Sequence, residues 1–218
     1  MLRSERWPVK RRDSPVPRVE RLRSSGPVSG EDDAGTDVPR GGLIGWYLGS
    51  NVPTMKPIDS GRVVRRYTQH IDSPPESVFP LLCPVREAEW LEGWSDELEM
   101  IHSDTGHAED GCVFETRVAG RPDTVWMITR HDPIERVVEF FRVTTGLVAT
   151  RLTITVDGRS DGSSSVQITY AFTPLGSAGR AFVKDTHSED AFRADMAWWE
   201  NSMNHWLRSG ETLRAAVR

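Results

Sequence analysis

Residues 191–207 read AFRADMAWWENSMNHWL, and their bulky apolar side chains recur at helical spacing. Steps of four, three, four and three residues connect Phe192, Met196, Trp199, Met203 and Trp206. Side chains at this spacing share one face of an α-helix, so the tail from roughly 185 to 216 is predicted to be one amphipathic helix of up to about nine turns. Such a face needs a broad apolar surface to cover it.

The preceding residues can supply that surface as a sheet. Residues 62–71, RVVRRYTQHI, alternate between two faces and are rich in β-branched and aromatic residues, which is typical of a strand. Between residues 97 and 172, six more alternating segments are separated by turn residues: DELEMIHS, CVFETRVAG, DTVWMITRH, IERVVEFFRVT, LVATRLTITVD and SSVQITYAFT. Because the turns are too short to contain crossover helices, the seven strands are predicted to form an antiparallel sheet.

Two short helices are predicted after the first strand. In DSPPE, residues 72–76, Ser73 can cap a helix, Pro74 suits its first position, and Glu76 completes a capping box. Pro80 and Pro84 then interrupt the helical pattern, so we expect helices at about 74–82 and 84–91.

Residues 1–61 differ in composition from the rest. They show no strand or helix period and are dense in Pro, Gly, Ser and charge, which predicts a disordered or loosely docked leader ahead of one folded domain at 62–218. Its apolar tract, GGLIGWYLGS at 41–50, could dock on the domain or on a partner. The sequence also permits initiation at Met55, which would remove most of the leader.

The charge balance and the apolar runs limit the classes of partner. The chain has a formal net charge of −5, and residues 62–218 hold 17 basic against 24 acidic residues, which argues against a nucleic-acid partner. No apolar run is long enough for stable membrane insertion, and no secretory signal follows the basic start, so a cytoplasmic location is expected. Cys83 and Cys112 are too few for a disulfide framework. The sequence leaves the oligomeric state open.

Three stretches carry a family resemblance: RYTQHIDSPPESVF at 66–79, LCPVREAEWLEGW at 82–94, and AFRADMAWWENSMNHWL at 191–207. Over about 150 residues the chain resembles the START-like, or SRPBCC, superfamily of polyketide cyclases and lipid-transfer domains, and in particular a bacterial branch of it. The resemblance implies an α+β helix-grip fold, in which a seven-stranded antiparallel sheet wraps around a long C-terminal helix and leaves a cavity between them.

The resemblance also implies that large side chains line this cavity, although they could equally form an ordinary packed core. The helix stripe, the segment after the first strand and the inner sheet face supply the candidates for ligand binding, which are Trp90, Trp94, Phe114, Trp126, Phe141, Tyr170, Phe192, Met196, Trp199, Met203 and Trp206.

Charged residues on the strands are expected on the solvated face of the sheet. The set comprises Glu115, Arg117, Arg130, Glu139 and Arg142. Any one that pointed inward would orient the polar end of a ligand or act as an acid or base. In the segment 82–94, Arg86, Glu87 and Glu89 could form local ion pairs or hold the helix against the sheet.

The histidines and cysteines offer little evidence for chemistry. His205 lies at the edge of the helix stripe, and His102, His107, His131 and His187 fall at strand ends or in loops, where exposure is expected. His102, His107, Glu109 and Cys112 match no zinc signature, so no metal and no cofactor is predicted. Cys83 precedes a helix start, which could activate a nucleophile, but a buried structural cysteine is favoured.

Three functions remain open, and whether the protein is an enzyme is open with them. A carrier or sensor of a small hydrophobic or amphipathic molecule predicts a largely apolar cavity without perturbed titratable groups. A cyclase- or dehydratase-like enzyme predicts a buried histidine or carboxylate with a convergent partner. A protein-interaction or chaperone co-factor module predicts a filled cavity and a large exposed apolar patch.

Overall fold

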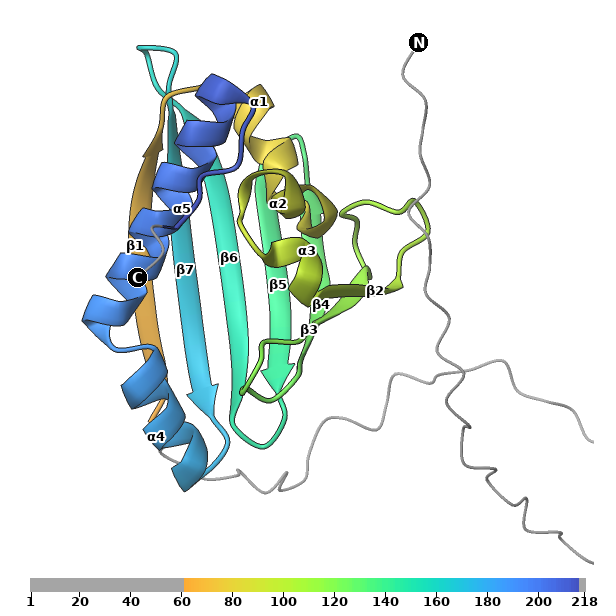
Figure 1. Cartoon of the computed structure of the whole chain (residues 1–218), viewed down its shortest axis with the longest axis vertical. Coiled ribbons are helices and arrows are strands. Elements are labelled where there is room, and N and C mark those ends of the chain that lie inside the picture. The colour runs from red at the N-terminus through yellow and green to blue at the C-terminus, as the bar shows by residue number, and fades with distance from the viewer. Residues whose placement is uncertain (1–60, 216–218) are drawn as a thin grey trace, which may run out of the picture. The chain divides into compact units, whose positions relative to one another are not determined.

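The computed structural model describes residues 61–215. The expected leader at 1–61, with its GGLIGWYLGS tract, lies outside the described residues except for its last glycine. In the described part, one antiparallel sheet of seven strands carries the helices on one face (Figure 1). This is the helix-grip architecture expected from the order of the elements.

The strands follow the predicted segments closely. Their bounds are β1 Val63–Ile71, β2 Leu98–His102, β3 Val113–Thr116, β4 Thr124–Asp132, β5 Val137–Thr144, β6 Val148–Gly158 and β7 Ser164–Pro174. In the sheet they are ordered β1-β7-β6-β5-β4-β3-β2, so every sequential pair from β2 to β7 forms a hairpin. The first strand joins the far side by pairing with the last, from Val63 opposite Phe172 to Ile71 opposite Ser164.

Four short helical segments lie between β1 and β2: α1 Pro75–Val78, the 3-10 helix η1 Phe79–Leu82, α2 Pro84–Trp90 and α3 Trp94–Glu97. The break expected at Pro84 is present, but the capping box is not. Pro74 is the N-cap and no side chain caps α1. Ser73 instead forms a turn, in which its backbone N–H donates to the Ile71 carbonyl (2.8 Å) and its own carbonyl accepts from the Ser164 hydroxyl (2.7 Å). The helix therefore starts one residue later than predicted.

The C-terminal tail forms two helices and not one. The helices are α4, Ser177–Thr186, and α5, Glu189–Ser209. The Ser188 hydroxyl accepts the Ala191 backbone N–H (3.3 Å) and so starts α5, and Gly210 ends it in the left-handed conformation (φ 70°). The long helix predicted at roughly 185–216 is thus present as α5, which starts four residues later and ends seven residues earlier than predicted and makes about six turns.

Helix α5 is attached to the edge of the sheet at β1. The buried Gln69 side chain donates from Nε2 to the Met196 carbonyl of α5 (2.9 Å). Farther along, the Asn204 side chain accepts from the Asp72 N–H and donates to the His70 carbonyl, both at 2.8 Å. Figure 1 shows α5 along the β1–β7 side of the sheet, with α2 and α3 on the other side.

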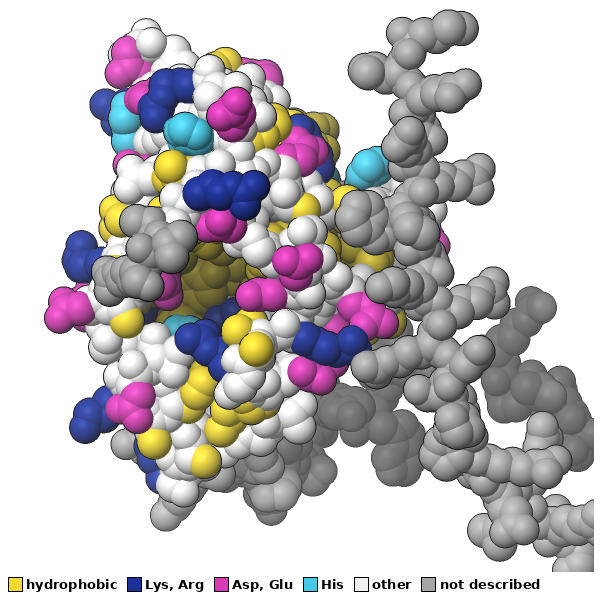
Figure 2. All heavy atoms as spheres, viewed as in Figure 1, with side chains coloured by type: hydrophobic (Ala, Val, Ile, Leu, Met, Phe, Trp, Pro, Cys, Tyr) yellow, Lys and Arg dark blue, Asp and Glu magenta, His cyan; other side chains and the backbone are white. Residues whose placement is uncertain are grey.

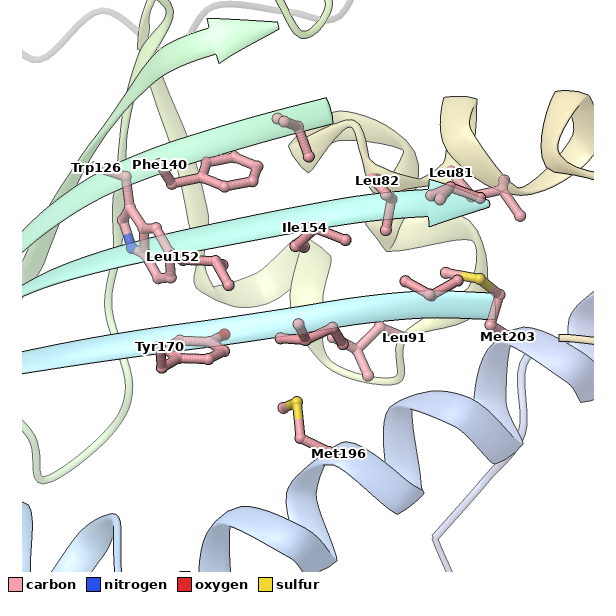
Figure 3. Packing of buried hydrophobic residues seen from close by; sticks show 14 of the residues in the cluster. Leu81, Leu82, Leu91, Trp126, Phe140, Leu152, Ile154, Tyr170, Met196 and Met203 are labelled. Carbon is pink, nitrogen blue, oxygen red and sulfur yellow. The ribbon is translucent and has the colours of Figure 1, made fainter. Parts of the chain in front are cut away.

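The core fills the layer between sheet and helices. Trp126, Phe140, Leu152 and Tyr170 project from four neighbouring strands on the same face, with Met196 and Met203 of α5 on the other side of the layer (Figure 3). The buried residues on the inner face of the sheet include Phe114, Thr116, Leu152, Ile154, Val156, Val166, Ile168, Tyr170 and Phe172. No helix of the described residues is long and apolar enough to cross a membrane.

Candidate ligand-binding cavity

A cavity of about 90 Å³ lies between the sheet and the helices. In the view of Figure 1, the surface shows a hollow with a hydrophobic floor between α5 and the α2–α3 segment (Figure 2). The residues that line the cavity come from α2, α3, α5 and five strands, and they are Glu87, Trp94, Phe114, Trp126, Phe140, Arg142, Leu152, Tyr170 and Trp199.

Aromatic rings make up most of the wall and hold one another in place. Phe114 stacks on Trp126, with ring centroids 5.4 Å apart, and Phe140 meets both rings edge-on at 6.4 and 6.1 Å. On β7, Tyr170 stacks on Phe172 at 5.5 Å. Such offset and edge contacts stabilise aromatic clusters beyond their buried area. The sheet side of the cavity is therefore a preformed aromatic surface.

Hydrogen bonds fix the tryptophans around the cavity. The indole N–H of Trp126 donates to the Thr116 hydroxyl (2.9 Å), and that of Trp94 donates to the Pro84 carbonyl (2.7 Å). Trp90 donates to the Leu81 carbonyl (3.0 Å) and meets Trp199 of α5 edge-on, with centroids 5.9 Å apart. The segment 82–94 thus forms one side of the cavity, with Trp94 at its boundary and Trp90 behind it.

The structure brings five of the eleven candidate ligand-binding residues to the cavity wall: Trp94, Phe114, Trp126, Tyr170 and Trp199. Five others pack in or against the adjoining core, namely Trp90, Phe192, Met196, Met203 and Trp206. Contact with a ligand stays a prediction for all ten of these residues.

Phe141 is the exception, and the structure corrects its assignment. Its side chain is 45% exposed, whereas Phe140 is 3% exposed and lines the cavity. Successive side chains of a strand point to opposite faces, so only one of two adjacent phenylalanines can face inward. Val138 and Phe140 are both buried on β5 and lie two residues apart. This alternation could have predicted that Phe140, and not Phe141, faces inward.

The same parity places Arg142 on the inner face. Its guanidinium carbon lies 4.5 Å from the ring centroid of Trp126 and 5.5 Å from that of Tyr170. Its Nε is buried and has no hydrogen-bond partner among the described residues. Burial lowers the pKa of Arg142, and the nearby positive charge of Arg121 acts in the same direction. Of the five charged strand residues named from the sequence, Arg142 is therefore the one that faces the cavity.

The other charged strand residues form ion pairs away from the cavity, as expected for a solvated face. Arg117 pairs with Glu115 and Glu99, and the Arg130 guanidinium lies 2.9 Å from the Asp132 carboxylate. Glu139 accepts a hydrogen bond from Arg151 on β6 (2.7 Å).

Glu87 lines the cavity, whereas the sequence suggested only a local ion pair or a contact between helix and sheet for it. It is only 4% exposed, and burial alone raises the pKa of its carboxyl from 4.5 to about 8. Its side chain makes no hydrogen bond or ion pair with any residue in the described part of the chain. The expected local pair forms without it, since Arg86 donates to Glu89 at 2.9 Å. Pro84, Glu87 and Trp90 recur every three residues and share the buried face of α2, but which face of this short helix is buried depends on its packing.

One protein family matches most of the described residues. The family described as polyketide cyclase/dehydrase and lipid transport matches residues 62–197, which is more than half of the chain. The chain belongs to this family. It is accordingly a START-like protein of the SRPBCC superfamily, as the three resembling stretches implied. No curated protein sequence matches the chain.

Solved structures show the same fold at low sequence identity. Norcoclaurine synthase from Thalictrum flavum is 14% identical, with a TM-score of 0.53 over 74% of this chain and 98% of that one. A complex of that enzyme with dopamine and hydroxybenzaldehyde matches with 15% identity and a TM-score of 0.52, over 76% and 99% of the two chains. The protein Ara h 8.0201 matches with 13% identity and a TM-score of 0.52, over 68% and 99%.

Two more ionisable groups of this family member have shifted pKa values, Tyr170 in the cavity wall and His187, and both rings stack on Phe172. Burial raises the pKa of Tyr170 to about 12, so its hydroxyl stays protonated at neutral pH. His187, expected to be exposed, is half-buried and stacks on Phe172 with centroids 4.4 Å apart. Burial, followed by the charges of Arg142, Arg121 and Arg65, lowers its pKa to about 3. His187 is half-buried because it is the C-cap residue of α4, where its ring stacks on Phe172 of β7.

Both cysteines have structural environments. Cys83 is buried at the N-cap of α2, where its sulfur accepts the Ala108 N–H (3.2 Å). Burial raises the pKa of the Cys112 thiol to about 11, which opposes thiolate formation. Glu109 accepts hydrogen bonds from Ser103 and from neighbouring backbone N–H groups, so it orders its own loop. Within residues 61–215, no group of three His, Cys, Asp or Glu residues is placed to hold a metal ion.

Proposed function

We propose that the domain at 62–218 binds a small, largely apolar molecule with a polar end in the cavity between sheet and α5. One observation carries this proposal: an aromatic wall surrounds three polar side chains without hydrogen-bond partners among the described residues, those of Glu87, Arg142 and Tyr170. Buried polar groups are normally hydrogen-bonded, so their convergence on one cavity suits a ligand that supplies the missing partners.

The size of the cavity limits how such a molecule enters. About 90 Å³ is below the roughly 150 Å³ of a cavity that takes up benzene. A ring-bearing ligand therefore needs the wall to move. Half-buried Trp94 sits on the four-residue helix α3, which follows Gly93 in the left-handed conformation (φ 81°). We propose that α3 and Trp94 shift outward on binding, because the sheet side of the wall is locked by ring stacking and hydrogen bonds.

The comparisons support this proposal at the level of the family. The family description includes lipid transport as well as polyketide cyclases and dehydrases. The norcoclaurine synthase complex contains two small aromatic molecules in a protein of the same fold. Because Glu87, Arg142 and Tyr170 with shifted pKa values lie in its wall, the cavity is not the purely apolar one that a carrier or sensor predicts, and experiment must separate carrier, sensor and enzyme within the proposed binding function.

Tryptophan fluorescence and native mass spectrometry test the binding function. We expect small aromatic molecules such as phenol and indole to change the emission of the wall tryptophans in a saturable way. Leu152→Phe adds a ring inside the cavity and should abolish this change, whereas Val143→Phe adds the same ring on the outer face of β5 and should leave it intact. The absence of both a saturable change and a co-purified small molecule would count against the function, as would unaltered binding by Leu152→Phe.

A cyclase- or dehydratase-like enzyme is a second candidate, favoured by Glu87. A carboxyl with a pKa near 8 can both hold and accept a proton at neutral pH, as a general acid or base must. The positive charge of Arg142 on the same cavity would stabilise an enolate formed from a bound ketone. The cavity thus contains a base and an anion-stabilising group.

Deuterium exchange separates the enzyme from the carrier. If Glu87 acts as a base, the protein will catalyse exchange of the hydrogens beside the carbonyl of phenylacetone in D₂O, followed by NMR. Glu87→Gln should bind the ketone but lose the exchange, while Glu89→Gln, altered on the exposed side of α2, should retain it. Binding of the ketone without exchange above the buffer rate would contradict the enzyme and leave the carrier as the remaining function.

A further inference from the structure

Arg142 has an unusual environment for a charged side chain. It faces the cavity between Trp126 and Tyr170, its buried Nε donates no hydrogen bond, and no carboxylate of the described residues forms an ion pair with it. Every other buried-face position of β5 is apolar or threonine: Val138, Phe140 and Thr144. One cation is therefore placed within an otherwise aromatic layer.

Arg142 cannot avoid the cost of burying its charge by losing a proton. Buried lysines and histidines commonly become neutral, but arginine keeps its charge under all ordinary conditions. The ring faces of Trp126 and Tyr170 attract the guanidinium, but a cation–π contact replaces only part of the hydration that burial removes. The planar guanidinium presents five N–H donors, and an acceptor for them is missing from the described structure.

Glu87 does not serve as the counterion. It lines the same cavity from α2, yet no ion pair forms between the two side chains, and burial is the sole cause of its raised pKa. A close guanidinium would lower that pKa. With a pKa of about 8, most Glu87 side chains are neutral at pH 7 and can donate a hydrogen bond. The charge that a ligand meets inside the cavity is then that of Arg142.

Building on the proposed binding function, we propose that the ligand is a small carboxylate, whose anionic group Arg142 holds between the rings of Trp126 and Tyr170. A guanidinium and a carboxylate can form two parallel hydrogen bonds, which would satisfy the donors now without partners. The apolar part of the ligand then lies against Phe114, Phe140 and Leu152, and the Tyr170 hydroxyl or neutral Glu87 can donate to the second face of the anion.

Two probes of equal shape test this assignment, namely phenylacetate and phenylacetamide, titrated into the full chain at pH 7 by calorimetry and fluorescence. The wild-type protein should bind the acid at least about tenfold more tightly than the amide. Arg142→Met should weaken phenylacetate binding by about tenfold or more and leave phenylacetamide unchanged. Arg151→Met, altered on the outer face of the neighbouring strand, should match the wild type.

The outcomes separate this inference from the function on which it rests. Equal affinity for both probes, or an acid preference that survives Arg142→Met, would overturn the role of Arg142 while leaving the cavity a binding site. Binding of neutral phenol and indole without phenylacetate would do the same. If no probe binds, both the role of Arg142 and the proposed binding function are contradicted. Arg142→Lys replaces the planar donors with an ammonium whose charge burial disfavours, so a weaker preference for the acid than in the wild type is expected, and its thermal unfolding checks that the domain stays folded.

Discussion

Adjacent residues on β5 have opposite surroundings, and this one-residue alternation determines what the cavity contains. Phe140 and Arg142 face inward, while Phe141 lies outside opposite Met127 of β4. The sequence predicted the strand but placed the wrong phenylalanine in the wall. The information was present in the spacing of Val138, Phe140 and Thr144, because a strand presents every second residue to one face.

Truncation of the two phenylalanines should reveal this alternation directly. We expect Phe140→Ala to lower the free energy of unfolding by about 3–5 kcal/mol, because it removes a buried ring that contacts Phe114 and Trp126. Phe141→Ala should cost about 1 kcal/mol or less, since its ring is already partly in water. Urea unfolding of both variants measures the difference, and similar losses would show that the inner and outer faces are assigned wrongly.

Glu87 shows a limit of sequence reasoning at the residue scale. Acidic residues on short helices are usually exposed, and its neighbours Arg86 and Glu89 do form an exposed pair. Which side of α2 is buried depends on how Pro84 and Trp90 pack, and that rotation is set by the tertiary structure. The helix could be predicted from local signals, but the burial of its carboxylate could not.

At the scale of elements, the strands were predictable and the C-terminal helices only in part. Strand boundaries follow turn residues, which act locally, and each predicted strand lies within a few residues of the observed one. Helix α4 escaped prediction because it is short and contains Gly179, a residue that usually disfavours helices. The packing of α4 explains that glycine.

Gly179 allows α4 to approach the turn between β5 and β6. A Cβ at this position would lie 1.9 Å from the Leu147 carbonyl oxygen, which already accepts the Leu175 N–H at 2.7 Å. Gly179→Ala should therefore destabilise the domain by about 2 kcal/mol or more, despite the roughly 1 kcal/mol that alanine adds to helix propensity. Thermal unfolding against Ser177→Ala, an exposed position on the same helix, gives the comparison. A stabilised Gly179→Ala would rule out the close approach.

At the scale of the whole molecule, two buried groups titrate in opposite directions. Glu87 stays protonated in the folded state up to about pH 8 but loses its proton near 4.5 when unfolded. Folding is therefore progressively penalised as the pH rises between these values. His187 stays neutral in the folded state down to about pH 3, whereas the unfolded chain protonates it near 6.5. Its effect is to penalise folding as the pH falls below 6.5.

The free energy of unfolding should consequently be greatest between about pH 4.5 and 6.5 and should fall toward pH 8, by up to about 1.4 kcal/mol per pH unit from Glu87. Glu87→Gln should flatten the alkaline side of this profile, because its amide does not ionise. Glu89→Gln, on the exposed side of the same helix, should keep the wild-type shape. Denaturant unfolding at five pH values tests this, and parallel curves for wild type and Glu87→Gln would contradict the burial of this carboxyl.

The architecture as a whole was predictable because several independent signals agreed: seven alternating segments, the short helices and one long amphipathic stripe. The cavity was not. It arises because α5 is fixed to β1 through Gln69 and Asn204, while α2 and α3 cover the opposite side, and no local pattern states how far apart these helices lie. Of the bulky residues on the helix stripe, only Trp199 lines the space that remains.

The pairing of the first strand with the last also governs the order in which the domain can be made. On the ribosome, β1 is synthesised roughly 100 residues before β7, and within residues 61–215 its long ladder from Val63 to Ile71 has no other strand as a partner. The hairpins from β2 to β7 can form one after another, but the sheet edge and the docking of α5 must wait for the end of the chain. Contacts this distant in sequence slow folding, so the newly made β1 spends the longest time exposed to chaperones and to other nascent chains.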